Sequence, residues 1–505
     1  MSSAPSGPVP ASAVARSGAF SLAGSVTSAF MGLLLTVVIG RALGASGAGV
    51  VLQAIAAFTI ALSVGKAGLD TTAVWLLPRL AVEDVSQLRP ALLGLIVPAF
   101  TLGALNGVAL YLFAYVTDPD NGALSEVLRT MAWFLPFGTA MIVALSSTRG
   151  LGGVRPYVLV NSIGLPTLRP LLVLMVTWAG SGVLGTTLAW VSPLPVAMVL
   201  SIILLARNVA RREASDSIRG SYRPSRSLHR RIWGYAAPRS VSGILEQSML
   251  WIGILLVGAL ISPSAAGIYG AASRFVGAGL ILSTAMRIVV APIYSRALGL
   301  GRVTEAQTTY TTTTKWIVLS STPIYITLAT FGGTVLSALG SEFRDGAMTL
   351  MILSLGLLIV LLGGNINSML LMSGRSGLAA INKLVALTIN VAGVFILVPI
   401  WGIEGAALAW STSMVVDAAL AAYQVHRLVG VKVMGSGVAL AAFIPMVTFG
   451  VVAVSTRIIA GDTFRGMLAA LLIGLVAWCL LSYRLRHHLE LEGITLLWHG
   501  RKRSG

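Results

Sequence analysis

Long apolar runs recur along almost the whole chain, and they constrain its fold more than any other feature. Crossing the hydrocarbon core of a bilayer takes about 20 apolar residues of helix. Runs of this length recur often enough to predict an all-α integral membrane protein with about fourteen transmembrane helices. The expected spans lie near residues 17–40, 50–77, 90–116, 128–149, 156–180, 183–206, 240–261, 266–290, 315–338, 347–371, 380–400, 402–424, 436–457 and 465–483.

The composition excludes several other classes of protein. Hydrophobic residues make up 56% of the 505 residues and charged residues only 10%, which is too little polar surface for a soluble globule or a disordered chain. The single cysteine, Cys479, excludes an intramolecular disulfide and a thiolate metal site. The sequence also lacks CxxC, HExxH and phosphate-loop patterns. We therefore expect no metal, no cofactor and no enzymatic activity.

The net charge of +18 is best explained by membrane topology. In a soluble protein it would suggest nucleic acid, but here most basic residues fall on one side of the predicted spans. Both termini should therefore be cytosolic, and we expect no nucleic-acid partner. The excess of arginine over lysine is typical of GC-rich bacterial genomes, so a bacterial plasma membrane is expected. The basic residues predicted outside are Arg41, Arg129, Arg344, Arg457 and Arg465.

One polar stretch, residues 207–239, divides the predicted helices into a group of six and a group of eight. Its final part, SLHRRIWGYAAP, could also lie along the inner membrane interface. The first apolar run is too long for the core of a signal peptide, so we expect it to be retained. The expected organisation is a disordered cytosolic tail (1–16), an N-terminal six-helix lobe (17–206), a basic cytosolic linker (207–239), a C-terminal six-helix lobe (240–424), two additional helices (436–483) and a basic cytosolic tail (484–505).

Two phrases recur at nearly the same offset. GVLGTTLAW at 182–190 returns as GIEGAALAW at 402–410, an offset of 220 residues. ASGAGVVLQA at 45–54 aligns with PSAAGIYGAA at 263–272, an offset of 218. Six helices is an even number, so both halves should have the same orientation and form parallel repeats around a central cavity. Rocking of two such lobes would expose the cavity to each side of the membrane in turn, so we expect a transporter. A membrane glycan polymerase or ligase would need larger outer loops than these.

Charged residues inside the membrane are costly and are therefore candidate functional residues. The two deepest arginines are Arg274, about 12 Å from the outer face, and Arg169, about 20 Å from the inner face. A guanidinium can bind phosphate oxygens bidentately, so both are candidates for holding a phosphorylated lipid headgroup. Arg287 falls at the cytosolic interface, where snorkelling explains it.

Three acidic residues and one lysine complete this set. Lys66 and Asp70 are spaced i, i+4, which predicts a neutralising pair on one helical face, with a cavity role for Lys66 as the alternative. Glu246 lies about 9 Å from the cytosol and Asp417 about 22 Å from the outer face. Pairing with an arginine and binding of a coupling proton or cation both stay open for these two carboxylates.

Several segments resemble the polysaccharide transporters of the multidrug/oligosaccharidyl-lipid/polysaccharide (MOP) superfamily, which include Wzx-type O-antigen flippases and lipid II flippases. The segments are GLDTTAVWLLPRLA, GIYGAASRF with APIYSRAL, and GRSGLAAINKLVALTINVAGVFILVPIWGIEGAALAW. The resemblance implies translocation of a lipid-linked oligosaccharide, carried on undecaprenyl pyrophosphate, from the inner to the outer leaflet by alternating access. Membrane lipids and glycan polymerases or other envelope-synthesis proteins are the implied partners, and a monomer is expected.

The resemblance also bears on particular residues. In lipid II flippases an arginine on the eighth helix lines the cavity, and Arg274 matches it in position. Those proteins also have an arginine within the first helix, which residues 17–40 lack. The last two predicted helices resemble the pair that forms a lipid-tail groove in lipid II flippases. A drug or metabolite antiporter of the same superfamily and a non-transporting scaffold of envelope assembly are the alternatives.

Overall fold

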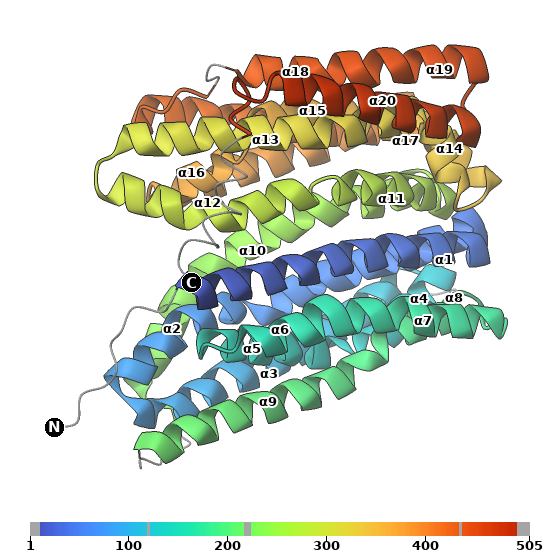
Figure 1. Ribbon diagram of the computed structural model, residues 1–505. Coiled ribbons are helices and arrows are strands. Elements are labelled where there is room, and N and C mark those ends of the chain that lie inside the picture. The colour runs from blue at the N-terminus through green and yellow to red at the C-terminus, as the bar shows by residue number, and fades with distance from the viewer. Residues whose placement is uncertain (1–10, 119–121, 217–223, 434–436, 492–505) are drawn as a thin grey trace. The chain divides into compact units, whose positions relative to one another are not determined.

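A computed structural model describes residues 11–118, 122–216, 224–433 and 437–491. Within these ranges the regular structure is helical and no strand occurs, which confirms the all-α prediction. The chain separates into two compact units (Figure 1). Unit 1 comprises Met1–Ala42 and Gln53–Trp251, and unit 2 comprises Leu43–Leu52 and Ile252–Gly505. Two long helices, α1 and α10, contribute to both units.

The helices that begin in unit 1 follow one another with short breaks. They are α1 (Ala11–Lys66), α2 (Leu69–Glu83), η1 (Val85–Gln87), α3 (Leu88–Thr117), α4 (Ala123–Ala132), α5 (Leu135–Gly150), α6 (Val154–Tyr157), the π-helix η2 (Val158–Gly164), α7 (Leu165–Trp178), α8 (Gly182–Val191), α9 (Pro193–Asp216) and α10 (Arg226–Leu260).

Unit 2 contains the remaining helices. They are α11 (Pro263–Ala278), α12 (Ile281–Gly299), α13 (Val303–Thr330), α14 (Gly332–Ser337), η3 (Ser341–Gly346), α15 (Ala347–Leu362), α16 (Ile366–Met372), α17 (Ser376–Val429), α18 (Val438–Pro445), the π-helix η4 (Met446–Val451), α19 (Val452–Ala460) and α20 (Phe464–Arg484).

Ten helical stretches in the described part of the chain are long and apolar enough to cross a membrane, or eleven if α4 and α5 form one bent span. Two of the ten, 20–83 and 376–429, are interrupted at Gly44 and Gly402, where φ is positive. Each of these two covers two of the predicted spans. The protein is therefore multi-pass, while the count of fourteen stays a prediction.

The recurring phrases mark a tight turn at the start of a helix. Gly182 and Gly402 have φ of 61° and 58°, a left-handed conformation that favours glycine. At Gly402, α17 folds back on itself, and a Cβ on Gly405 would lie 2.3 Å from the carbonyl oxygen of Leu397. The two glycines of GIEGAALAW thus allow the turn and the close approach of the two arms that follows it.

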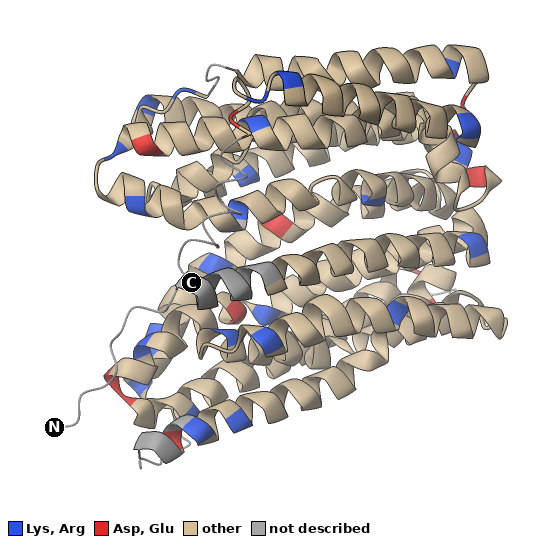
Figure 2. Ribbon diagram, viewed as in Figure 1, with Lys and Arg blue, Asp and Glu red and all other residues tan. Residues whose placement is uncertain are grey.

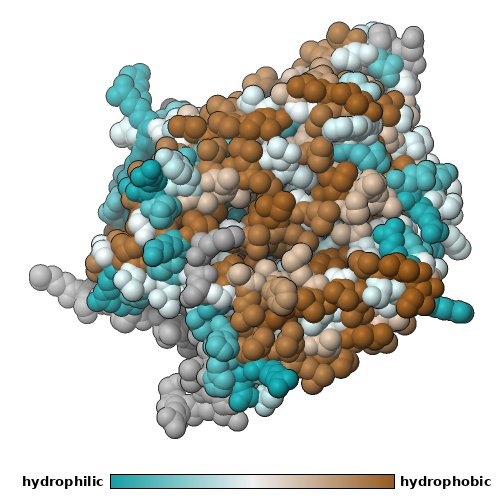
Figure 3. Space-filling model, turned by 90° about the horizontal axis from the view of Figure 1, so that it is seen from above, coloured by the Kyte–Doolittle hydropathy of each residue, from teal (hydrophilic) through white to brown (hydrophobic). Residues whose placement is uncertain are grey.

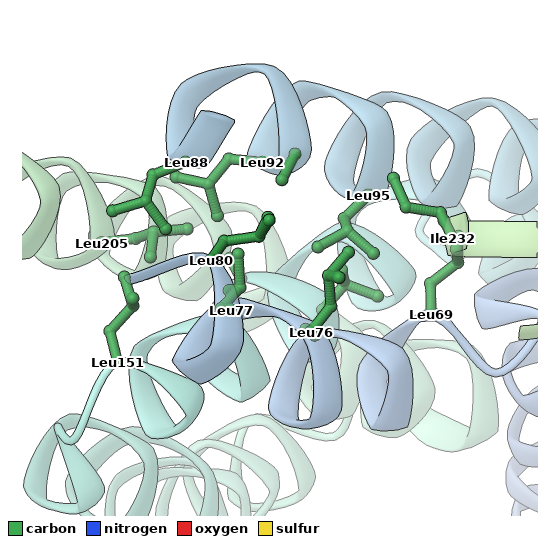
Figure 4. Close-up of a cluster of buried hydrophobic side chains, with 14 of the residues drawn as sticks. Leu69, Leu76, Leu77, Leu80, Leu88, Leu92, Leu95, Leu151, Leu205 and Ile232 are labelled. Atoms are coloured by element: carbon green, nitrogen blue, oxygen red, sulfur yellow. The ribbon is translucent and has the colours of Figure 1, made fainter. Parts of the chain in front are cut away.

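A cluster of leucines forms the core at one end of unit 1 (Figure 4). Part of this core comes from the segment predicted as a linker, because Ile232 on α10 is fully buried in it. The described ends of that segment are helical, with α9 running to Asp216 and α10 beginning at Arg226. The labelled residues come from α2 (Leu69, Leu76, Leu77, Leu80), α3 (Leu88, Leu92, Leu95), the turn after α5 (Leu151), α9 (Leu205) and α10 (Ile232).

The outer surfaces of the helices suit a bilayer. Figure 2 shows lysines, arginines and carboxylates gathered mostly towards the ends of the helices, and Figure 3 shows hydrophobic residues spread across the face in view. On α20, Leu472, Val476 and Leu480 are all more than half exposed, at a spacing of four residues. Gly474 and Ala470 on the same helix are buried. Such a stripe would be unfavourable in water and is what lipid requires.

Candidate substrate and coupling sites

Arg274 lies in the last turns of α11. The helix begins with Ser262 as its N-cap, whose hydroxyl accepts a hydrogen bond from the amide of Ala265, and with Pro263 at its first position. Arg274 is partly buried and stands four residues before the helix ends at Ala278. Arg287, the control residue in the depth argument, lies on α12 and is exposed.

The helix that carries Arg274 is broken just after it, and a tyrosine from α13 fills the break. The hydroxyl of Tyr325 donates a hydrogen bond to the carbonyl oxygen of Val276 at 3.1 Å. A Cβ on Gly279 would lie 2.6 Å from the Tyr325 ring. The same carbonyl also accepts a hydrogen bond from the amide of Gly279 at 3.2 Å, so Tyr325 adds a second donor where α11 gives way to α12.

Arg169 is held by a tryptophan of the same unit. Its Nε donates to the carbonyl oxygen of Trp190 at 3.0 Å, and its guanidinium carbon lies 3.8 Å from the centre of the Trp190 ring. Trp190 is the last residue of the first recurring phrase. The contact satisfies a backbone carbonyl near the break between α8 and α9, so Arg169 has a structural partner that sequence depth alone did not reveal.

Lys66 and Asp70 form the expected ion pair, at 2.8 Å. The helical geometry behind that prediction is wrong, however. α1 ends at Lys66 and α2 begins at Leu69, and between them Ala67 and Gly68 both have positive φ. The pair therefore bridges a break, where Gly68 is required because a Cβ there would lie 2.4 Å from the carbonyl oxygen of Ala236.

Asp417 is buried in unit 2 and is paired with a lysine. Its Oδ2 accepts hydrogen bonds from Lys383 at 2.6 Å and from the amide of Asn367 at 3.0 Å. Its side chain is 1% exposed, and within the described part of the chain its Oδ1 has no hydrogen-bond partner. The carboxylate is thus compensated in charge but keeps one oxygen that could accept a proton or a cation.

Lys383 was the partner that the sequence did not suggest, since it stands near the cytosolic start of its span. Comparison of the two copies of the predicted repeat could have indicated this pairing. At the offset of 220, Lys383 and Asp417 correspond to Ile163 and Ala197 in the first copy, so both charges appear only in the second. Two charges gained together at neighbouring positions of one hairpin favour a pair.

Glu246 lies on α10 and is exposed. Among the described residues no salt bridge involves it, in contrast to Asp417. The two carboxylates that the sequence left open therefore differ in surroundings, one being buried beside a lysine and the other accessible.

An apolar groove of about 360 Å³ runs between α13, η4 and α20. We call it the tail groove. It is open at this position because η4 is a π-helix following Pro445, and because Gly474 leaves room for the ring of Phe449. The tail groove is lined by Ser320, Pro323, Ile324, Thr327, Leu328, Phe449, Leu471, Leu475 and Trp478.

Residues 485–491, which we call the C-terminal strap, close unit 2 below this groove. Leu489 is fully buried near Leu319 and Ile444. The carboxylate of Glu490 accepts hydrogen bonds from Thr312 and from Lys315, the latter at 2.9 Å. Burial by itself raises the pKa of Glu490, but these hydrogen bonds outweigh it and lower the pKa below the ordinary value.

The segment SLHRRIWGYAAP packs on α2. Tyr235 stacks on Trp75 with ring centroids 4.5 Å apart and planes 5° apart. Arg231 donates to Glu83 at 2.9 Å, and this hydrogen bond lowers the pKa of the Glu83 carboxyl. The predicted interfacial segment is thus the beginning of α10 and is held to unit 1 by its aromatic and charged side chains.

Comparison with known proteins identifies the fold. The MatE family model matches residues 238–396. Among solved structures, the inward closed conformation of the lipid II flippase MurJ aligns with a TM-score of 0.69 and 13% identity, covering 93% of this chain and 99% of that one. An inward-facing multidrug resistance MATE family transporter of the MOP superfamily aligns with a TM-score of 0.60 and 17% identity, covering 80% and 96%. The chain has the fold of these transporters.

A curated relative of this chain is "Probable low-salt glycan biosynthesis flippase Agl15" from Haloferax volcanii. It is 22% identical over 262 residues, and the match covers 51% of this chain and 54% of that protein. The chain therefore spans about half the length of the curated relative that it matches. At such identities the structural likenesses establish the fold, while the substrate has to be argued from the residues.

Proposed function

We propose that this protein is a transporter of the MOP superfamily and a flippase for a lipid-linked oligosaccharide, and that the lipid carrier is an isoprenoid pyrophosphate such as undecaprenyl pyrophosphate. It moves this lipid from the inner to the outer leaflet of a bacterial plasma membrane by alternating access, with both termini cytosolic. The tail groove is the single observation that carries the proposal. A water-soluble drug needs no open apolar channel along α20, whereas an isoprenoid chain needs a surface on which to stay in lipid while its headgroup crosses.

Several features of the tail groove suit an isoprenoid chain. Its walls are almost wholly apolar, with Thr327 and Ser320 as the polar residues among the lining side chains. The hydroxyl of Thr327 donates to the carbonyl oxygen of Pro323, so it presents no free donor to the groove. Trp478 lies at the inner part of the groove and donates its Nε1–H to the carbonyl oxygen of Leu319, which fixes its ring as a wall.

Arg274 is the residue that we propose for the pyrophosphate. A guanidinium offers five N–H donors in a planar fork, which matches phosphate oxygens better than an ammonium does. Its placement beside the Tyr325-filled break suits this role, because α12 can change its direction there while α11 keeps its own. Arg169 has Trp190 as its partner and is the weaker candidate, and Lys66 with Asp70 serves as a structural bridge.

The Lys383–Asp417–Asn367 cluster is the candidate coupling element. A proton or a monovalent cation on Oδ1 of Asp417 would weaken the pair with Lys383. The two residues lie on the two arms of α17, which meet at the bend at Gly402. The proposal leaves the driving ion open between proton and sodium. Glu246, being accessible, is the second candidate for binding the coupling ion.

The second candidate function is export of a drug or metabolite, favoured by the likeness to multidrug resistance transporters. Reconstituted vesicles separate the two. The full-length protein should move a fluorescent isoprenoid-pyrophosphate oligosaccharide between leaflets, measured by loss of fluorescence when a membrane-impermeant quencher is added outside. Ion-driven uptake of a cationic dye without any lipid movement would support the antiporter and overturn the flippase.

A further inference from the structure

A second groove, of about 530 Å³, opens at the opposite end of α13 from the strap. We call it the Arg457 groove. It lies between the last turn of α13, the first turns of α15 and the last turns of α19, all within unit 2. The predicted topology puts these helix ends at the outer leaflet. Leu355 lies eight residues into α15, so the groove reaches about 12 Å down from the start of that helix.

Arg457 gives this groove a charged rim. Its Nη1 donates to the carbonyl oxygen of Thr330, the last residue of α13, where helix carbonyls lack partners and the dipole favours a cation. The side chain is exposed, and within the described part of the chain Arg457 has no other hydrogen bond and no ion pair. Four of its five N–H donors are thus available to a ligand.

Among the described residues, no carboxylate forms an ion pair with this arginine. The nearest acidic side chain along the chain, Asp462, accepts hydrogen bonds at Oδ1 from both the amide and the hydroxyl of Thr334. Its backbone carbonyl accepts a hydrogen bond from Arg344. Asp462 therefore fastens the turn after α19 to α14, and the charge of Arg457 remains uncompensated.

The walls below Arg457 are apolar. They include Met351 and Leu355 on α15 and Val454 and Ile458 on α19, and the last three of these side chains are about half exposed or more. A cation at headgroup depth above an apolar channel complements an amphiphile with an anionic head and a hydrocarbon chain. One guanidinium without a second cation matches the single charge of a phosphodiester better than the several charges of a pyrophosphate.

We propose that the Arg457 groove binds an anionic glycerophospholipid of the outer leaflet, with its phosphate on Arg457 and one acyl chain between α15 and α19. This lipid is distinct from the transported substrate, and the site does not depend on the proposed function. Its occupant would fill the space between α19 and α15 and so fasten the last two helices to the rest of unit 2.

Native mass spectrometry of the detergent-purified full-length protein tests this site. Phosphatidylglycerol, phosphatidylcholine and undecaprenyl phosphate are offered in turn, and retained lipids are counted. We expect the wild type to retain one phosphatidylglycerol with about tenfold preference over phosphatidylcholine. Arg457→Gln should lose this preference, because the amide can still cap Thr330 but carries no charge. Arg457→Lys should keep most of it.

Two further variants keep the test decisive. Arg465→Gln removes another exposed arginine at the predicted outer face that does not line the groove, and it should leave the preference unchanged. Leu355→Trp should abolish retention by filling the groove while leaving Arg457 in place. Equal losses in Arg457→Gln and Arg465→Gln, retention unaffected by Leu355→Trp, or selective retention of undecaprenyl phosphate over phosphatidylglycerol would each overturn the proposal.

Discussion

Gly49 and Gly267 pack against each other reciprocally, each lying beside the backbone that precedes the other. A Cβ on Gly49 would lie 1.6 Å from the carbonyl oxygen of Pro263, and one on Gly267 would lie 2.1 Å from that of Ala45. Each such Cβ would also lie 3.0 Å from the amide nitrogen of the other glycine. The two glycines are 218 residues apart, so the contact joins equivalent positions of the two predicted repeats.

This crossing should not tolerate a methyl group on either glycine. Gly49→Ala or Gly267→Ala should destabilise the protein by about 1–3 kcal/mol, because the clash is with backbone that has no rotamer to adjust. The matched control is Gly32→Ala on α1, where a Cβ meets nothing within 4 Å. It should be neutral or slightly stabilising. Thermal unfolding in detergent measures both, and equal midpoints for Gly49→Ala and Gly32→Ala would contradict the crossing.

The Lys383–Asp417 pair can be separated into its structural and coupling roles. Lys383→Met leaves a buried carboxylate without compensation and should cost about 3 kcal/mol. Adding Asp417→Asn should restore most of this stability, since no charge then remains.

If Asp417 also couples transport to an ion, the double variant should be stable but should lose the dependence of transport on a proton or sodium gradient. Thermal midpoints and gradient-driven transport in vesicles read the two roles separately. A double variant with normal gradient dependence would leave the pair with a structural role alone.

Filling the tail groove should block transport without unfolding the protein. Leu475→Trp places a bulky ring among Thr327, Phe449 and Trp478, whereas Leu472→Trp, three residues earlier on α20, points a similar ring outside the groove. We expect lipid movement in vesicles to fall at least about tenfold for Leu475→Trp and to stay near wild type for Leu472→Trp. Equal rates for the two variants would show that the tail groove does not carry the chain.

The strap should weaken in acid. The lowered pKa of Glu490 means that its stabilisation is complete above the ordinary value of 4.5 and is lost as the pH falls through the lowered pKa. Because Glu490 is partly exposed, Glu490→Gln should cost only about 1 kcal/mol or less at neutral pH. The difference between the midpoints of wild type and variant should shrink as the pH falls below 4.5. A constant difference across this range would mean that the ion pair does not hold the strap.

The helical character of the chain could be predicted from the sequence because it depends on local pattern. The apolar runs predicted the helices, and the spacing of GVLGTTLAW and GIEGAALAW predicted the equivalence that Gly182 and Gly402 display in their positive φ. Arg274 could be picked out by depth alone, since depth follows from the helical rise.

The side-chain partners of the charged residues were harder to predict from the sequence, because they depend on the direction of a side chain and on packing between distant helices. Depth could not tell that Arg169 turns towards Trp190, or that Lys383 reaches Asp417. The break between Lys66 and Asp70 requires positive φ at Ala67, which is uncommon for a residue with a side chain. Each of the two grooves has a wall from α13 and a wall from a helix more than a hundred residues later in the chain, so neither could be predicted from local pattern.

The central claim is that this protein moves a lipid-linked oligosaccharide, and depletion of the protein in its host tests it most directly. Lipids are extracted after depletion and identified by mass, with their leaflet assigned by access to an impermeant reagent. We predict that an isoprenoid-pyrophosphate oligosaccharide accumulates in the inner leaflet. Wild type and Arg287→Ala should clear it, whereas Arg274→Ala should not. If no such lipid accumulates, or if Arg274→Ala clears it as well as Arg287→Ala does, the account is contradicted.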